Sequence, residues 1–548
     1  MLEEHGVLGE ANVTELNLHF IPLEHDLLSL ELEDAFSDMC LRKDPTPIFA
    51  SAKALMLLQK QYGLFPRILG KGDNAKRLAD LLQRMRSEED VNVSSDPSNT
   101  YLTSFGLTPS ALIENLIIID REVDFPTILA TQLTYEGLID ETFGISNNQV
   151  EVDSSMMSSV PQQQQNHQQR DGTSPAPTAA TKRKVQVDSS DKLYPDIRDA
   201  NFATVGPLLN RTARRLASEQ DNIKTTQKSV AELKSIVNTL PSHQAEKASL
   251  AIHIAIWEGT KTHTTSDIFR KMLEVEQNLL ADGGGSDATA MHDNIEELIA
   301  RGNVPLHTVL RLLCLESCLT NGIRQRELDS FKRHILHAYG YQHLLTLCNL
   351  EKAGLLTTRE SHRGFLNPIA GTAGQTATDW NAVRRALNLW VDDVAESDPD
   401  DIAYVFSGYA PLSVRLVQCV LQKSYLQSLV SGPARNLPGA AAATSQMSGW
   451  KGFEDTLARI RGATVDVVQK GHDADAAHAR QTLRGNREGP KVSLVFFLGG
   501  VTFAEVAALR LVSSRLEASG RQIIVGTTGM LSGKRAVDVA VEKKSFAG

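Results

Sequence analysis

The sequence predicts an α/β protein whose parallel sheet is interrupted by a long helical insertion, so the expected class is α/β plus α. Two observations predict it. Before residue 151 and after residue 401, short apolar runs of strand length alternate with longer stretches of helical period. Between residues 192 and 355, apolar residues follow helical spacing and no convincing strand occurs. We therefore expect one sheet built from two distant parts of the chain.

Four apolar runs are expected to form strands that are buried on both faces. Each run is nearly continuous in apolar residues and ends at Gly, Asp or Ser, as expected for strands of a covered parallel sheet. The runs cover residues 116–119, 402–406, 492–498 and 523–525. They are the clearest strands of the predicted sheet.

The helical insertion contains a predicted turn at Pro241. Apolar residues recur at helical spacing on both sides of this proline: Val230, Leu233, Val237 and Leu240 precede it, and Leu250, Ile254 and Trp257 follow it. Because proline favours the first turn of a helix, Pro241 is expected to end one helix and begin the next. The result is a helical hairpin with a polar tip at residues 242–247. Such a hairpin is either a structural corner or a surface for a partner helix, and the residues alone leave both open.

Several segments differ in composition from the rest of the chain. Residues 151–191 are rich in Gln, Ser and Pro and poor in large apolar residues, which predicts a disordered insertion. Residues 362–378, 431–449 and 471–490 are rich in Gly, Ala or charged residues. We expect these three segments to form surface loops between ordered blocks.

Charge and hydropathy exclude several classes of protein. The 548 residues include 56 Lys and Arg against 66 Asp and Glu, a formal net charge of −10, which argues against nucleic acid as the main partner. No apolar run approaches the roughly 20 residues of a membrane-spanning helix. The acidic start of the chain lacks the features of a secretory signal, so we expect a cytosolic protein. The five cysteines are scattered, and Cys314 and Cys318 are expected to pack in a core rather than to bind a metal.

Three glycine-rich segments resemble phosphate-binding loops without matching one. They lie at residues 70–82, 496–510 and 526–535, and each lacks part of the glycine and lysine spacing that such loops require. In the first, a glycine-rich turn and the helix after it could place Lys71 and backbone N–H groups around a phosphate. We expect these glycines to permit tight turns between strands and helices rather than to bind a nucleotide.

A cluster of charges follows the first predicted strand. Asp120, Glu122 and Asp124 surround Arg121 at the carboxyl end of that strand. We expect a self-contained turn, in which the carboxylates cap backbone N–H groups or pair with Arg121, rather than a metal site. No H-E-x-x-H or G-x-S-x-G motif occurs. The chain is therefore expected to be no enzyme and to need no cofactor or metal, with a nucleotide-dependent enzyme and a purely structural scaffold as the alternatives.

Four stretches of the chain resemble a known family. Residues 117–145, IIIDREVDFPTILATQLTYEGLIDETFGI, are similar to the signature of the SM family of SNARE-binding proteins. Residues 64–85, 404–416 and 494–510 are similar to the vacuolar branch of that family, whose members are subunits of the HOPS and CORVET tethering complexes. The resemblance follows the order of the chain apart from the loops.

The resemblance implies an arch of three domains in which a split α/β domain 2 is interrupted by a largely helical domain 3. We expect domain 2 to comprise residues 21–131 and 361–548, and domain 3 to comprise residues 132–360. Residues 1–20 resemble only the last part of the family's first domain, so we expect most of that domain to be missing through truncation. The family cleft that receives a Qa SNARE is then in doubt.

The resemblance also implies the function. SM proteins of this branch guide the assembly of Qa and R SNAREs for fusion at vacuole, lysosome and endosome membranes, without making or breaking a bond, and they reach the membrane through the tethering complex. The family hairpin that contacts SNAREs corresponds to the segment around Pro241. The residues expected to contact SNAREs are Leu240, Pro241, Ser242, His243 and Glu246.

A second surface is implied for a partner in the tethering complex. Residues 332–356 are similar to the family segment that docks vacuolar protein sorting-associated protein 16. Lys332, Tyr341 and Leu344 match the positions expected to face that protein. A Tyr and a Leu three positions apart on one helix face would form an apolar anchor, with the Lys at its rim. The alternative is that Tyr341 and Leu344 are buried in the core of their own domain.

Overall fold

The computed structural model describes residues 18–95, 109–153, 182–225, 230–282, 288–359, 377–431, 448–469 and 491–541. The expected loops at 362–378, 431–449 and 471–490 lie largely outside these ranges, as does most of the expected disordered insertion. None of the described helices is long and apolar enough to cross a membrane.

The central sheet has seven strands in the order β1-β2-β10-β9-β4-β3-β8. The strands from β2 through β10, β9 and β4 to β3 are parallel, and β1 and β8 pair antiparallel at the two edges. Strands from the first and the last parts of the described chain are therefore interleaved in one sheet. The bounds are β1 Ile21–Glu24, β2 Leu27–Ser29, β3 Arg67–Lys71, β4 Ile113–Asp120, β8 Thr464–Val468, β9 Lys491–Leu498 and β10 Arg521–Thr527.

Three of the four predicted strands are confirmed, and one prediction was wrong. Residues 116–119 lie in β4, 492–498 in β9 and 523–525 in β10. Residues Ile402–Phe406 instead form the 3-10 helix η6, which Asp401 caps by accepting a hydrogen bond from the Ala403 N–H at 2.9 Å. All five residues of η6 are buried. A short segment that is enclosed on every side has the same unbroken apolar composition as a central strand, so composition could not separate the two.

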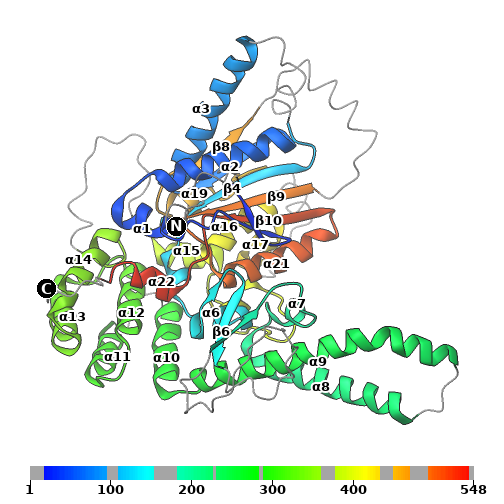
Figure 1. Cartoon of the computed structure of the whole chain (residues 1–548). Coiled ribbons are helices and arrows are strands. Elements are labelled where there is room, and N and C mark those ends of the chain that lie inside the picture. Colours follow the sequence, from blue (N-terminus) through cyan, green and yellow to red (C-terminus); the bar gives the residue numbers. More distant parts are fainter. Residues whose placement is uncertain are drawn as a thin grey trace, which may run out of the picture.

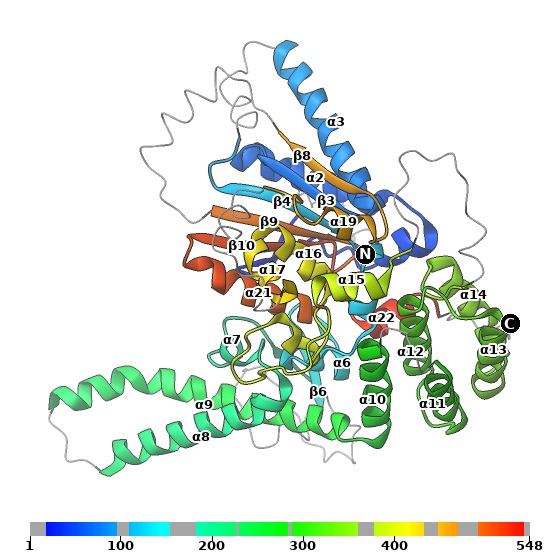
Figure 2. The same ribbon diagram turned by 180° about the vertical axis from the view of Figure 1, so that it is seen from behind.

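Helices cover both faces of the sheet (Figures 1 and 2). Alternate residues of β4 face opposite sides, because successive side chains of a strand point in opposite directions. Leu116 and Ile118 pack with α2 (Thr46–Tyr62) and α3 (Asp73–Ser95). Ile117 and Ile119 belong to the core on the other face, which includes η6, α16 (Leu412–Leu421) and α21 (Phe503–Glu517). The remaining helices beside the sheet are α1 Ala35–Ser37, η1 Asp38–Arg42, α15 Trp380–Leu387, α17 Lys423–Ser431, α19 Glu454–Ala458 and α22 Gly533–Asp538.

The inserted region is mostly helical. Figure 1 shows α8 and α9 as a long pair that projects beyond the rest of the molecule, with α10 to α14 beside the sheet region. The bounds are α6 Tyr135–Thr142, α7 Tyr194–Ile197, α8 Phe202–Thr225, α9 Val230–Thr264, α10 Asp267–Asp282, α11 Ala288–Ala300, α12 Leu306–Leu319, α13 Gln325–Tyr339, η5 Tyr341–His343 and α14 Leu344–Ala353.

The expected disordered insertion is wrong at both of its ends. Strand β6 (Gln149–Asp153) pairs antiparallel with β7 (Lys182–Gln186), and β5 (Ile145–Ser146) completes a small sheet. Val150, Val152 and Val185 are buried in a core that they share with α8 and α9. The alternation of valine with polar residues is a strand pattern, which the Gln-rich and Ser-rich composition between the two strands concealed.

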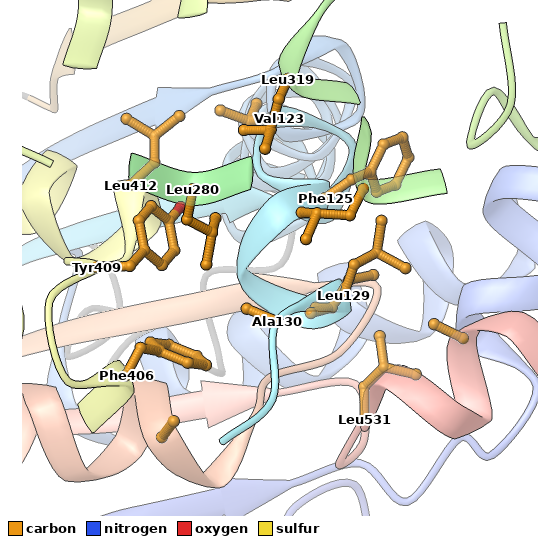
Figure 3. Packing of buried hydrophobic residues seen from close by; sticks show 14 of the residues in the cluster. Val123, Phe125, Leu129, Ala130, Leu280, Leu319, Phe406, Tyr409, Leu412 and Leu531 are labelled. Carbon is orange, nitrogen blue, oxygen red and sulfur yellow. The ribbon is translucent and has the colours of Figure 1, made fainter. Parts of the chain in front are cut away.

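The sheet and the helical region share one continuous core, which Figure 3 shows from close by. The segment formed by η4 (Arg121–Val123) and α5 (Phe125–Leu129) directly follows β4. Its apolar side chains pack against residues of α10, α12 and η6, including Leu280, Leu319 and Phe406. Side chains from the sheet and from the insertion pack together, so one hydrophobic core joins the two regions.

A buried cluster of charges also joins the two regions. Arg510 of α21 donates to Asp26 and to Asp199, each at 2.8 Å, and lies 3.5 Å from Glu136 of α6. The Tyr194 hydroxyl donates to the other oxygen of Glu136 at 2.7 Å. Burial, only partly offset by Arg510, raises the pKa of Glu136 to about 7. The cluster therefore contains a carboxyl group that ionises at an energetic cost.

Candidate functional site

The first glycine-rich segment holds a lysine whose hydrogen bonds are all internal. Lys71 is buried at the end of β3. Its Nζ donates to the Leu457 carbonyl at 3.0 Å, the Gly462 carbonyl at 2.6 Å and the Thr464 hydroxyl at 3.2 Å. Burial lowers the pKa of Lys71 to about 8. Because an ammonium group has three donors, none remains for a phosphate.

The second glycine-rich segment is closed by Arg121. Gly499 and Gly500 have φ of 100° and 109°, which side chains of L-residues rarely adopt. A Cβ on Gly499 would lie 2.8 Å from the Cβ of Arg121. The guanidinium of Arg121 donates at 2.9 Å to both carboxylate oxygens of Glu505. The buried ion pair of Arg121 and Glu505 therefore occupies the space next to Gly499 and Gly500.

The carboxylates around Arg121 cap backbone N–H groups and approach Arg121, as the sequence predicts, but the turn also has partners in distant segments and is not self-contained. Asp120 accepts hydrogen bonds from the backbone N–H groups of Asn74 at 2.8 Å and Glu122 at 3.2 Å. Asp124 accepts from the Thr127 N–H at 3.1 Å, and its carboxylate lies 3.6 Å from Arg121. Burial raises the pKa of Asp120 to about 6. In the described ranges, no group of three or more His, Cys, Asp or Glu side chains is arranged to hold a metal ion.

The third glycine-rich segment is a contact between elements. Ser532 caps α22 by accepting from the Arg535 N–H. A Cβ on Gly533 would lie 2.6 Å from the guanidinium of Arg311, which belongs to α12. The Arg311 side chain in turn donates to Glu141 at 3.0 Å. In the first segment, a Cβ on Gly72 would lie 2.2 Å from the Cβ of Asp120, so glycines permit close packing in all three segments.

The predicted hairpin exists, but its turn is not at Pro241. Helix α9 runs without interruption from Val230 to Thr264 and contains Pro241 in its interior. Its partner in the hairpin is α8, and the connection at residues 226–229 lies outside the described residues. The prediction failed because packing of one helix against another can outweigh the local cost of a proline.

The five residues expected to contact SNAREs fall into two groups. Leu240, Pro241 and Ser242 are exposed, and Leu240 is 42% exposed despite being apolar. His243 and Glu246 are half-buried and contact α8: His243 lies 3.3 Å from Glu219, and Glu246 pairs with Arg215. The last two residues therefore hold α9 against α8, and the first three remain accessible.

Two of the three residues expected to face the tether partner are exposed. Tyr341 is 70% exposed and Leu344 is 52% exposed, so the alternative of burial in their own core is wrong. The two residues do not share one helix, because Tyr341 lies in η5 and Leu344 begins α14. Lys332 of α13 pairs with Glu351 of α14 and so links the two helices.

One neighbouring residue escaped the sequence analysis. Leu345 is also exposed and lies four positions after Tyr341. Leu344 and Leu345 are the first two residues of α14, and Tyr341 lies in η5 directly before it. The pair of leucines at 344 and 345 after a glycine-tyrosine step was the available signal. We refer to Tyr341, Leu344 and Leu345 as the η5–α14 patch.

Comparison with known proteins identifies relatives over almost the whole chain. The model of the Sec1 family matches residues 2–539. Vacuolar protein sorting-associated protein 33A of Rattus norvegicus is 39% identical over 546 residues, which cover 99% of this chain and 79% of the rat protein. The vacuolar protein-sorting-associated protein 33 homolog of Arabidopsis thaliana is 34% identical, with coverage of 99% and 79%.

Solved structures show the same fold at lower identity. The SM protein Vps45 in complex with the Qa SNARE Tlg2 has a TM-score of 0.56 at 15% identity, and the match covers 97% of this chain and 78% of that chain. The Unc18–syntaxin 1 complex from Monosiga brevicollis has a TM-score of 0.58 at 15% identity, covering 95% and 76%. These likenesses concern the fold.

Proposed function

The chain belongs to the Sec1 family, the family of the SM proteins, and we propose that it binds SNARE proteins as the SM subunit of a HOPS or CORVET type of tethering complex. The observation that supports this most directly is the 39% identity to a vacuolar protein sorting-associated protein 33A over nearly the whole chain. In this proposal residues 21–131 and 361–548 are the two parts of domain 2, and residues 132–360 are domain 3.

The α8–α9 pair is the proposed SNARE-binding element. It projects from the molecule, so a long SNARE helix has room to lie along it (Figures 1 and 2). Leu240, Pro241 and Ser242 would contact the SNARE, while His243 and Glu246 keep α9 in place against α8. A rigid surface that holds two SNARE helices side by side reduces the entropy that is lost when the SNARE bundle forms.

Binding of purified SNARE motifs tests this proposal. We expect Leu240→Asp to weaken binding of Qa and R SNARE motifs by about tenfold or more, since it places a charge in an apolar contact. Leu57→Asp on α2 is the matched control, because Leu57 is also a helical leucine of similar exposure, 44% against 42%. Equal affinity of both variants, or no SNARE binding by the folded chain, would refute the assignment.

The η5–α14 patch is the proposed docking surface for a protein resembling vacuolar protein sorting-associated protein 16. Three exposed apolar side chains in one short segment form a suitable anchor. Through this partner the chain would reach vacuole, lysosome and late endosome membranes from the cytosol. A structural scaffold that ignores SNAREs would also use this surface, so the SNARE experiment separates the two.

Co-purification with such a partner tests the docking surface. We expect Tyr341→Asp to abolish complex formation, because it replaces the most exposed apolar side chain of the patch with a charge. Tyr62→Asp is the control, since Tyr62 is an exposed tyrosine of α2. Normal complex formation by Tyr341→Asp would exclude the η5–α14 patch as the docking surface.

A further inference from the structure

Helices α2 and α3 enclose a hollow on the outer side of the sheet. Its volume is about 400 Å³. Its lining residues belong to α2, α3 and the residue before α2, and none of them lies in α8, α9, α13 or α14. We call it the α2–α3 groove. It is lined by Pro45, Thr46, Ile48, Phe49, Arg77, Asp80, Leu81 and Arg84.

The groove has apolar side chains on both of its walls. Phe49 is 48% exposed, and its only ring contact among the described residues is the Lys53 ammonium, 4.7 Å from the ring centroid. Ile48 is only 5% exposed and lies deeper. Leu81 of α3 is half-buried on the opposite wall. A large apolar side chain that enters the groove would therefore contact Phe49 and Leu81 together.

The α3 wall is a regular charged face. Arg77, Asp80, Leu81 and Arg84 are spaced at i, i+3, i+4 and i+7, which places them on one side of the helix. Arg77 donates only to Asn74, at 3.3 Å. Arg84 makes no hydrogen bond or ion pair with any residue that the structure describes. Two guanidinium groups thus flank a leucine with most of their donors unused.

The groove carries positive charge in an acidic protein. Residues 44–90 contain eight Lys and Arg against six Asp and Glu, whereas the whole chain has a net charge of −10. Some of these charges are used internally: Lys71 is buried, and Arg67 forms two 2.7 Å hydrogen bonds with Asp466. The groove itself is lined by two arginines, Arg77 and Arg84, and one carboxylate, Asp80, so the charge of its lining is net positive.

We propose that the α2–α3 groove binds an acidic segment of a partner protein, which inserts one large apolar side chain between Phe49 and Leu81 and places carboxylates on Arg77 and Arg84. Arginine binds carboxylates through paired hydrogen bonds, which fixes the position of the segment along α3. The apolar side chain supplies affinity, and the charges supply orientation and speed of association. Asp80 repels a carboxylate placed midway between the two arginines.

A concave surface favours a peptide over a membrane. The deeper apolar residue, Ile48, is nearly buried, and a flat lipid surface would not reach it. A single side chain of a peptide fits a hollow of this size. Membrane-binding faces instead present protruding apolar residues that enter the lipid. The groove shares no residue with the α8–α9 pair or with the η5–α14 patch, so it is a distinct surface.

Selection of peptides tests the proposal directly. A display library of random short peptides is selected on the full folded chain, and enriched peptides are labelled with fluorescein for anisotropy titrations. We expect acidic peptides with one Phe, Trp or Leu, and loss of binding when that apolar residue is replaced by Ser. We expect Phe49→Ala and Arg84→Glu each to weaken binding by about tenfold or more. Arg326→Glu on α13, an exposed arginine, should leave the affinity unchanged.

Three results would overturn the proposal. The first is a selection without acidic peptides, or with none at all. The second is a set of peptides whose affinity is unaffected by Phe49→Ala and Arg84→Glu. The third is binding to vesicles that contain phosphatidylserine, lost in Arg84→Glu, without peptide binding, which would assign the surface to a membrane. Thermal unfolding of each variant shows that it is folded, as expected for changes at exposed residues.

Discussion

At the scale of single residues, Arg121 is a buried cation that lies between two buried carboxylates. It is fully buried between the carboxylates of Glu505, at 2.9 Å, and Asp124, at 3.6 Å. Its other guanidinium nitrogen donates to the Asp124 carbonyl at 2.6 Å. A buried ion pair costs desolvation energy, which strong mutual attraction and hydrogen bonds must offset. Removal of one partner leaves the others charged and uncompensated.

We therefore predict that Arg121→Met lowers the free energy of unfolding by about 3–5 kcal/mol. Denaturant titration followed by circular dichroism measures this change. Arg42→Met is the control: Arg42 forms a 2.8 Å ion pair with Asp38, but its side chain is 60% exposed, so we expect a loss below about 1 kcal/mol. Similar losses for the two variants would contradict the role assigned to the buried pair.

Glu136 gives a prediction about pH. Burial raises its pKa to about 7 in the folded protein from the ordinary value of 4.5. The folded state therefore holds this proton more tightly than the unfolded state does. The resulting stability is fully present below pH 4.5 and is lost as the pH rises through about 7.

The loss for wild type amounts to roughly 3 kcal/mol, at about 1.4 kcal/mol per pKa unit. Glu136→Gln cannot ionise, so we expect it to lack this part of the pH dependence. Denaturant titrations of both proteins across that pH range measure the difference. Parallel stability curves for wild type and Glu136→Gln would show that the pKa of Glu136 is the same in the folded and the unfolded protein.

The sequence revealed only part of the environment of Arg121. Asp124, three positions away, was recognised as a possible partner, whereas Glu505 is 384 positions away and was not. The same is true of Lys71, whose acceptors lie at Leu457, Gly462 and Thr464. Local spacing predicts contacts within a turn or helix. Contacts between distant strands and helices depend on the sheet order, which local spacing does not contain.

At the scale of elements, α9 contains a proline in its interior, where proline is unfavourable. Pro241 removes one backbone donor inside a helix of 35 residues. The contacts of His243 and Glu246 with α8 keep this part of α9 helical despite that loss. Pro241 is therefore a point at which the hairpin is locally weak.

We predict that Pro241→Ala strengthens α9, since proline is about 3 kcal/mol less favourable than alanine inside a helix. Amide hydrogen exchange of residues around position 241 should become slower, with no change in α13, which serves as an internal reference. Faster exchange in the variant would mean that the proline shapes α9 to fit α8. The SNARE titration described above would then show whether binding needs that shape.

Elements were predictable where their pattern was distinct. Strand β4 combines β-branched residues with a polar end at Asp120, and its prediction was confirmed. The run at η6 has similar composition but a different backbone, because Asp401 caps it as a helix and Ser407 ends it at φ 48°. The α8–α9 hairpin was predicted with its turn at Pro241, because a strong local signal was given more weight than the packing of α9 against α8. Only at Pro241 did a tertiary contact outweigh a local preference.

At the scale of the whole molecule, the two surfaces of the proposed function lie on different parts of the helical region. The exposed residues of α9 belong to the projecting pair, and the η5–α14 patch lies beside the sheet, with α10 and α12 between them (Figures 1 and 2). Sites without shared partners usually contribute independently to the free energy of binding.

We therefore predict that Leu240→Asp and Tyr341→Asp act separately. The double variant should lose SNARE binding by the same amount as Leu240→Asp alone, within about 0.5 kcal/mol. Isothermal titration with SNARE motifs, in the presence and absence of the tether partner, measures both quantities. A larger loss in the double variant would reveal coupling between the two surfaces.

The interleaved strand order of the central sheet also affects when the sheet can fold during synthesis. Strand β4 lies between β3 and β9, and β9 belongs to the last described part of the chain. Arg121 directly follows β4, and its partner Glu505 lies 384 residues later in the chain. Synthesis of those residues takes on the order of 20–80 s at about 5–20 residues per second. During that interval one edge of β4 and its apolar side chains lack their partners. The sheet can therefore be completed only after most of the chain has been synthesised.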